Sequence, residues 1–252
     1  MRILLVSDLH YKLRQYDWLI RAASGFDCVV VAGDQADIAS AVPAEVQIAA
    51  LSASLQVVAQ KAPLLVCSGN HDLNTRNIAG EKTADWLAPL RGPRLAVDGD
   101  TVWVGQALFT VCPWWDGPHG QQEVQAQMAA AAQQREPGRP WIWVYHAPPQ
   151  GPLSWTGRRH FGDPLLPELV RQYRPDAVLC GHIHEAPFKP GGGWVDRMAD
   201  TWLFNAGRQI GDTPTRIELD IEGSALARAR WISMEGMETR DLAGPQPDAP
   251  AQ

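Results

Sequence analysis

The chain lacks closely spaced cysteine pairs, long apolar runs and an excess of positive charge. Its four cysteines are scattered, which argues against a cysteine-rich scaffold and predicts buried, reduced thiols in a reducing compartment. No apolar run reaches the length of about 20 residues that a transmembrane helix needs. The short run at residues 3–6 is followed closely by Asp8, so it fails as the core of a secretion signal. We therefore expect a cytoplasmic protein without a membrane segment.

The charge and composition are those of an ordinary globular domain. A formal net charge of -6 argues against an extensive grip on a nucleic-acid backbone, so nucleic acid is not the expected partner. The length of 252 residues, 45% of them hydrophobic, fits one domain with a substantial core. We place this single domain at residues 1–241. Residues 242–252, in which Pro, Ala, Gln and Asp dominate, are predicted to be a disordered tail.

Residues that commonly bind metals follow five short apolar runs. Each run is predicted to be a strand. Ligand sites of sheets with parallel strands lie beyond the carboxyl ends of the strands, so the five segments are expected to converge. The runs cover residues 3–6, 29–32, 63–67, 141–145 and 177–180, and they lead into Asp8-Leu9-His10, Gly33-Asp34, Gly69-Asn70-His71-Asp72, His146 and Gly181-His182-Ile183-His184.

The donor atoms in these segments suit transition metals. Histidine nitrogen, carboxylate oxygen and one amide oxygen favour Mn, Fe, Zn, Co or Ni over Ca. The set is too rich for one ion, so a pair of divalent ions is the simpler interpretation. The alternative for Gly69-Asn70-His71-Asp72 is an ordinary turn, because Gly, Asn and Asp are common turn residues. The other four segments favour the metal interpretation.

Taken in order, these segments resemble the signature of the calcineurin-like metallophosphoesterase superfamily. Its blocks are D-x-H, G-D, G-N-H-[DE], H and G-H-x-H, and the chain matches all of them between Asp8 and His184. One block is common by chance, but the ordered set with a strand before each block is specific. The resemblance implies an α/β fold, a four-layer αββα sandwich of two mixed sheets, with a dinuclear metal site at the carboxyl ends of the strands.

The resemblance also implies a role for each site residue. Asp34 would bridge the two ions, and His71 would face the leaving group as the general acid. Asp37, in the longer block G-D-x-x-D, would orient His71, with a turn or helix-cap role as the alternative. The remaining ligands would be Asp8, His10 and His184 for one ion, and Asn70, His146 and His182 for the other.

The function implied by the resemblance is hydrolysis of a small-molecule phosphoester. A metal-bridging hydroxide would attack phosphorus in line, while the ions hold the attacking and leaving oxygens. We favour a diester, because the protein phosphatase branch carries a phosphate-binding arginine where this chain has Ile38. The alternatives are a phosphomonoesterase acting on a small molecule and a non-catalytic scaffold on the same fold. Scaffold members lose ligands, whereas this chain keeps every one.

Loops near the ligand blocks supply candidate substrate contacts. Trp114 could stack on an organic group, with simple packing as the alternative. Arg76 is close to His71 in sequence, although a solvated loop arginine is the alternative. The long loop after His146 contains Trp155 and is where substrate specificity is expected. Its Arg158, Arg159 and His160 could replace the missing phosphate-binding arginine, or their charges could simply be solvated.

Hydrophobic periodicity predicts the elements around the site. Helices are expected at residues 15–23, 43–61, about 81–87 and 121–134, and from residue 163 onward. Strands are expected at 94–97, 101–104 and 107–111, joined by hairpin turns at 98–100 and 105–106. A closing hairpin is expected from residues 215–221 and 227–232.

Overall fold

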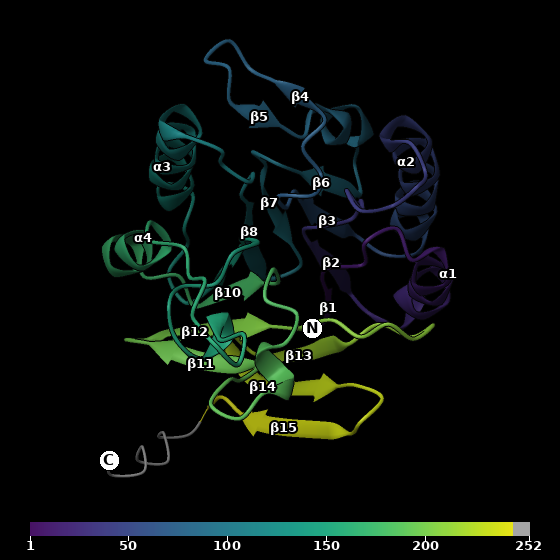
Figure 1. The fold of residues 1–252 in the computed structure, drawn as a ribbon. Coiled ribbons are helices and arrows are strands. Elements are labelled where there is room, and N and C mark those ends of the chain that lie inside the picture. Colours follow the sequence, from purple (N-terminus) through teal and green to yellow (C-terminus); the bar gives the residue numbers. More distant parts are fainter. Residues whose placement is uncertain (244–252) are drawn as a thin grey trace.

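Two β-sheets packed face to face form the centre of the fold, and helices cover both outer faces (Figure 1). The structure is a computed structural model that describes residues 1–243. Both sheets mix parallel and antiparallel pairs of strands. The predicted four-layer α/β sandwich of two mixed sheets is therefore confirmed.

The first sheet has seven strands and joins the two ends of the described chain. Strands β1, β2, β3 and β6 run parallel, whereas β13 pairs antiparallel with β1 and continues into β14 and β15. The strand order is β15 (Met237–Asp241), β14 (Ala225–Ile232), β13 (Arg216–Glu222), β1 (Arg2–Val6), β2 (Cys28–Ala32), β3 (Leu64–Cys67) and β6 (Leu95–Val97).

The second sheet has six strands, with parallel strands in its centre and an antiparallel strand at each edge. Its order is β11 (Val195–Met198), β12 (Thr201–Asn205), β10 (Ala177–Cys180), β9 (Trp141–Val144), β8 (Ala107–Val111) and β7 (Thr101–Val104). A separate ribbon of β4 (Thr75–Arg76) and β5 (Lys82–Thr83) projects beyond the sheets (Figure 1).

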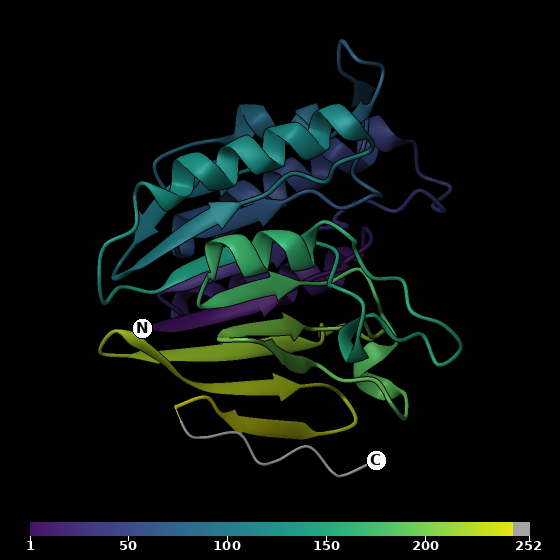
Figure 2. The same ribbon diagram turned by 90° about the vertical axis from the view of Figure 1, so that its left-hand side faces the viewer.

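Four α-helices form the outer layers. Helices α1 (Leu13–Ala22) and α2 (Ala44–Lys61) lie on one side, and α3 (Pro118–Ala132) and α4 (Leu166–Tyr173) lie on the other, where Figure 2 shows them in front. Helix α2 follows Pro43 directly and buries Leu51, Leu55 and Val58 along one face. None of the helices in residues 1–243 has both the length and the hydropathy needed to cross a bilayer.

Three apolar layers hold the sandwich together. The middle layer lies between the sheets and contains Phe109 and Phe204, both fully buried. The layer under α1 and α2 contains Leu19 and Leu55, and the layer under α3 and α4 contains Trp141. Side chains of a strand alternate between its two faces, so strands that are buried throughout supply two layers at once.

The predicted hairpin turn at residues 98–100 is wrong. Strand β6 belongs to the first sheet and β7 to the second, so this segment carries the chain from one sheet to the other. The Asp100 carboxylate accepts a hydrogen bond from the Val97 N–H at 2.8 Å and pairs with Arg91 at 2.7 Å. Turn residues predicted the change of direction, but not which sheet the next strand joins. The hairpin of β7 and β8 at residues 105–106 is confirmed.

The expected helix at residues 81–87 is also wrong. Strand β5 occupies residues 82–83, and a 3₁₀ helix follows at Asp85–Leu90 with Pro89 inside it. The Glu81 carboxylate accepts hydrogen bonds from the backbone N–H groups of His119 and Gly120, both at 2.8 Å, at the start of α3. Tertiary contacts therefore override the local helical preference.

Near the carboxy terminus, Leu242 does not belong to a disordered tail. It is buried, and its N–H donates to the Ala227 carbonyl at 2.9 Å. The rest of the predicted tail, apart from Ala243, lies outside the described residues. The closing hairpin of β13 and β14 is confirmed, and β15 adds a third strand that was not expected. Every residue of β15 is exposed, so it carries no apolar pattern to predict it.

Candidate metal centre

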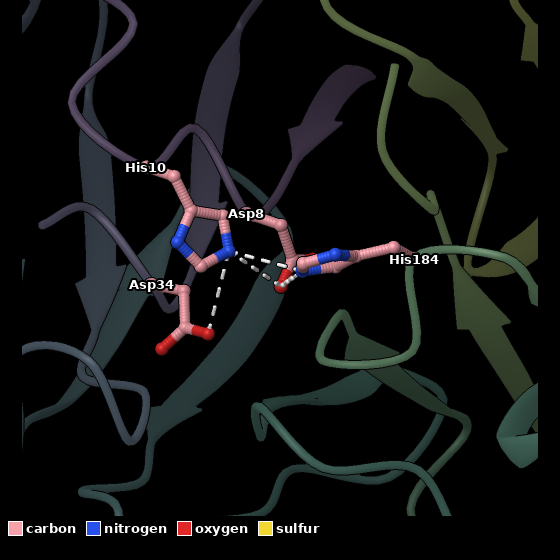
Figure 3. Close-up of side chains that lie close together, drawn as sticks. All are labelled: Asp8, His10, Asp34 and His184. Carbon is pink, nitrogen blue, oxygen red and sulfur yellow. Dashed lines mark hydrogen bonds and ion pairs between the residues drawn. The ribbon is translucent and has the colours of Figure 1, made fainter. Parts of the chain in front are cut away.

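The side chains that follow β1, β2, β9 and β10 meet at one end of the two sheets. The described residues contain three groups whose ring nitrogens and carboxylate oxygens lie within 4.8 Å of one another. Two of these groups share Asp34, and the third is His10, Asp37 and His71. Figure 3 draws the first group. That group is Asp8, His10, Asp34 and His184, and the second is Asp34, His146 and His182.

In the first group, the ring nitrogens point toward one another. His10 Nε2 lies 3.0 Å from His184 Nε2, 3.6 Å from Asp34 Oδ2 and 3.9 Å from Asp8 Oδ1 (Figure 3). His184 Nε2 lies 3.4 Å from the same oxygen of Asp8. Two neutral imidazoles cannot both present lone pairs to each other favourably, but both can present them to one cation. The donor set therefore fits a divalent metal.

Two buried atoms have no hydrogen-bond partner in the described part of the chain: His146 Nε2, in the second group, and Asn70 Oδ1, in the loop that follows β3. His146 Nδ1 donates to the Ala32 carbonyl at 2.7 Å, which leaves Nε2 facing Asp34 Oδ2 at 3.4 Å. Metal-binding histidines commonly have their second nitrogen held in this way. Because orphaned buried polar atoms are costly, these two fit a metal ligand set.

Backbone N–H groups hold both carboxylates in place. The His71 N–H donates to Asp34 Oδ1 at 2.9 Å, so Oδ2 is the oxygen that faces His10 and His146. The His182 N–H lies 3.0 and 3.1 Å from the two oxygens of Asp8. Each carboxylate is therefore oriented by a loop that also carries other residues of the site.

Strained backbone conformations concentrate at these residues. Asp8, His10, Asp34 and His182 have positive φ angles of 56°, 41°, 53° and 69°. The left-handed region is unfavourable for residues other than glycine and persists where the surrounding structure enforces it. The sheets enforce it here, and the strain marks this end of the fold as a functional site.

Close approach of the backbone explains two glycines in the ligand segments. A Cβ atom on Gly69 would lie 2.2 Å from Asp34 Oδ1, and one on Gly33 would lie 2.1 Å from His146 Nδ1. Neither neighbour can move without losing its place in the site. Glycine is therefore required where the loops pass beside the carboxylate and the imidazole.

Burial and charge together set the pKa values of the site. For Asp34, burial acts to raise the pKa, but the charges of His146 and His10 outweigh it and leave the pKa well below its ordinary range. For His146, burial acts to lower the pKa, but Asp34 and then Asp8 outweigh it and raise the pKa to about 9. Burial lowers the pKa of His10 to about 4. His146 is therefore the cation that compensates the buried carboxylates.

His71 lies beside both groups. Its Nδ1 accepts a hydrogen bond from the Ile38 N–H at 3.4 Å, so the proton of the neutral ring is on Nε2, 4.0 Å from Asp34 Oδ2. A carboxylate oxygen of Asp37 lies within 4.8 Å of a His71 ring nitrogen, but no hydrogen bond joins the two within the described residues. Asp37 Oδ1 instead accepts from the Ala39 N–H at 2.9 Å.

Of the predicted substrate contacts, Trp114 lies at the site. Its ring centre is 5.7 Å from that of His146 and 5.4 Å from that of His182. The backbone N–H of Trp114 donates at 2.9 Å to the hydroxyl of Ser68, which precedes Gly69. A cavity of about 460 Å³ has Trp114 as part of its wall.

The other predicted contacts take part in local structure. Arg76 donates to the Gly80 carbonyl within its own ribbon. Trp155 donates to the Pro190 carbonyl at 3.0 Å, and Arg159 lies 4.1 Å over the ring of Phe161. Arg158 is exposed.

One residue that supports the site was missed in the sequence. Asp72 is buried, and its carboxylate accepts hydrogen bonds from the Ala36 and Gly69 N–H groups, both at 2.8 Å. It ties the loop after β2 to the loop after β3. Its position in the G-N-H-[DE] block could have indicated this supporting role, because the block places an acidic residue beside the ligand loops that Asp72 joins.

Comparisons with known proteins agree with this geometry. A family model described as calcineurin-like phosphoesterase matches residues 1–186. No curated protein is similar enough in sequence to match. Among solved structures, TT1561 of Thermus thermophilus has 14% identity and a TM-score of 0.60, with 96% of this chain and 98% of that chain covered. A hypothetical protein from the same organism has 14% identity, a TM-score of 0.51 and coverage of 96% and 99%.

Asp34→Asn should lower the pKa of His146 in metal-free protein. In the wild type the carboxylate charge outweighs burial, so the proton on His146 stabilises the fold below pH 6.5, and this contribution is lost as the pH rises through about 9. Without that charge, burial dominates and the pKa should fall toward or below about 6.5. NMR titration of the imidazole after chelation measures this. Asp212→Asn, at an exposed carboxylate, is the control. A value still near 9 in Asp34→Asn would show that the carboxylate is not the cause.

Proposed function

The chain belongs to the calcineurin-like phosphoesterase family, and from this premise we propose that it hydrolyses a small-molecule phosphodiester at a centre of two divalent metal ions. Metal-dependent hydrolysis of a phosphoester bond follows from the family. The number of ions, the preference for a diester and the roles of individual residues are the proposal. The observation that carries it is the shared carboxylate, because Asp34 is common to two groups of potential ligands.

The residues present fit the metals that the family uses. Asp8, His10 and His184 would hold one ion, Asn70, His146 and His182 the other, and Asp34 would bridge them through Oδ2. The donor set suits Mn, Fe, Zn, Co or Ni. Such ions lower the pKa of bound water and neutralise charge on the phosphoryl group.

His71 is proposed to donate the proton that the departing oxygen needs. Its Nε2 faces the site, 4.0 Å from Asp34 Oδ2, and the ring would donate from this nitrogen as the imidazolium. The Ile38 N–H, 3.4 Å from Nδ1, and the edge of the His10 ring, at 4.5 Å between centres, restrict its rotation. We propose Asp37 as a positioning residue, through the turn that presents the Ile38 N–H.

The preference for a diester rests on an aromatic side chain beside the proposed ligands. Trp114 packs against His146 and His182. It also forms part of the wall of a cavity of about 460 Å³, which none of the proposed ligands lines. Ile38, where the protein phosphatase branch has its arginine, is 71% exposed and cannot bind a phosphate oxygen. Trp155, Arg158 and Arg159 are proposed as outer contacts of the substrate.

The alternatives predict different measurements. A phosphomonoesterase would need a site for the additional charge of a monoester, and a scaffold would have no use for two strained groups of metal-binding residues.

The four cysteines are all buried and free, which supports the proposed cytoplasmic location.

With added Mn, the protein should hydrolyse bis-p-nitrophenyl phosphate faster than p-nitrophenyl phosphate. The second aryl group of the diester would pack against Trp114, whose ring centre lies 5.7 Å from that of His146, whereas the monoester has no such group. Release of p-nitrophenolate measures both rates, and chelated protein is the control. A faster reaction with the monoester would assign a phosphomonoesterase, and no metal-dependent reaction with either would favour the scaffold.

His71→Ala should separate leaving groups by their basicity. An alkoxide needs a proton to depart and p-nitrophenolate does not, so activity on alkyl diesters should fall by about 10²–10⁴-fold and activity on nitrophenyl esters much less. Metal content, measured in the same samples, should not change. Equal loss on both substrates with the metals retained would exclude His71 as the general acid.

A further inference from the structure

Arg208 lies beside the candidate metal centre, in the segment that follows β12. Its backbone N–H donates to the carbonyl of His184 at 3.1 Å. His184 belongs to the first ligand group, so the backbone of Arg208 is fixed next to that group. Arg208 and His184 are both distant in sequence from Asp8 and His10.

The segment before Arg208 is held rigidly. The Asn205 side-chain amide donates to the Ile183 carbonyl at 3.0 Å, and the Thr215 hydroxyl donates to the Gly207 carbonyl at 2.7 Å. Gly207 has a φ of +67°, and a Cβ there would lie 2.6 Å from Pro187. Glycine is required at this position, and the contacts fix the point from which the Arg208 side chain starts.

The charge of Arg208 has no partner among residues 1–243. Its Nε is buried without a hydrogen bond, and no carboxylate lies within 4.0 Å of its guanidinium. Arg197 and Arg230 also have a buried, unbonded Nε, but each reaches a carboxylate with another nitrogen, at 3.8 Å and 3.1 Å. An unpaired, half-buried guanidinium is costly unless an anion binds it.

Arg208 adds positive charge on the side of the site formed by His10 and His184. Its backbone is bonded to the carbonyl of His184, and His184 Nε2 lies 3.0 Å from His10 Nε2.

We infer that Arg208 binds a non-bridging oxygen of the phosphoryl group, in place of the arginine that is absent at Ile38. The inference rests on the proposed phosphoesterase function. A guanidinium presents paired N–H donors that match phosphate oxygens, and its charge persists at any working pH. It would hold the phosphoryl group from the side of the first ligand group.

Binding of inorganic phosphate to the Mn-loaded protein, measured by calorimetry, tests this role without turnover. Arg208→Ala should weaken phosphate binding by roughly ten- to a hundredfold, the range for a charged hydrogen bond. Arg208→Lys should weaken it less, because it keeps the charge and loses the paired donors. Metal content and the thermal midpoint should stay as in the wild type.

Arg14→Ala is the matched control. Arg14 is 78% exposed in its side chain and pairs with Asp212 at 2.9 Å, so its loss removes one positive charge near the same loop and should leave phosphate binding unchanged. If Arg208→Ala does not fold, Arg208→Lys decides. Unchanged phosphate affinity in Arg208→Lys and in any folded Arg208→Ala overturns the inference.

Activity assays on the same samples separate the two hypotheses. If Arg208→Ala binds phosphate more weakly and the wild type hydrolyses no ester, the phosphate contact is supported and the proposed function is contradicted. Normal hydrolysis and normal phosphate affinity in both Arg208 variants would contradict the contact alone. A wild type that neither binds phosphate nor hydrolyses an ester would overturn both.

Discussion

The site depends on one buried carboxylate that two groups of potential metal ligands share. Asp34 is 2% exposed, and its Oδ2 lies 3.6 Å from a ring nitrogen of His10 and 3.4 Å from one of His146. A buried carboxylate requires compensating positive charge and donors. The protein supplies the His71 N–H to one oxygen and a protonated His146 near the other. Divalent ions would take the place of the proton on His146 and bring more positive charge to the carboxylate. The same arrangement therefore suits both metal binding and the attraction of a negatively charged phosphate.

The two sheets make this arrangement possible. Parallel strands from both sheets end at the same side, so loops far apart in sequence bring their side chains to one place. The loops must then turn sharply, which accounts for positive φ at Asp8 and Asp34 and for the close passage of Gly69 beside Asp34. The buried layers on both faces of each sheet stabilise this strained edge.

The sequence predicted the parts of this design that are local or that follow from strand burial. The strands before Asp8, Asp34 and His146 are short and buried, and each could be predicted because it is a continuous apolar run in the sequence. The residues after them converge as expected, although their roles as ligands stay predictions. Helix α2 was equally predictable, because Leu51, Leu55 and Val58 repeat along one face.

What the sequence did not predict depends on partners distant along the chain. Whether β7 pairs with β6 or joins the other sheet is set by packing between the sheets. Strand β15 is exposed and polar, so no apolar alternation marks it. No sequence motif singles out Arg208, because its place is set by the carbonyl of His184 and by the fit of Gly207 against Pro187.

The most direct test of the shared carboxylate is a crystal structure of the Mn-loaded protein with anomalous scattering measured at the manganese edge. The account predicts two manganese peaks in each chain, both bound by Asp34, with Asp8, His10 and His184 around one and Asn70, His146 and His182 around the other. A single peak at full occupancy, or two peaks of which only one contacts Asp34, would contradict it.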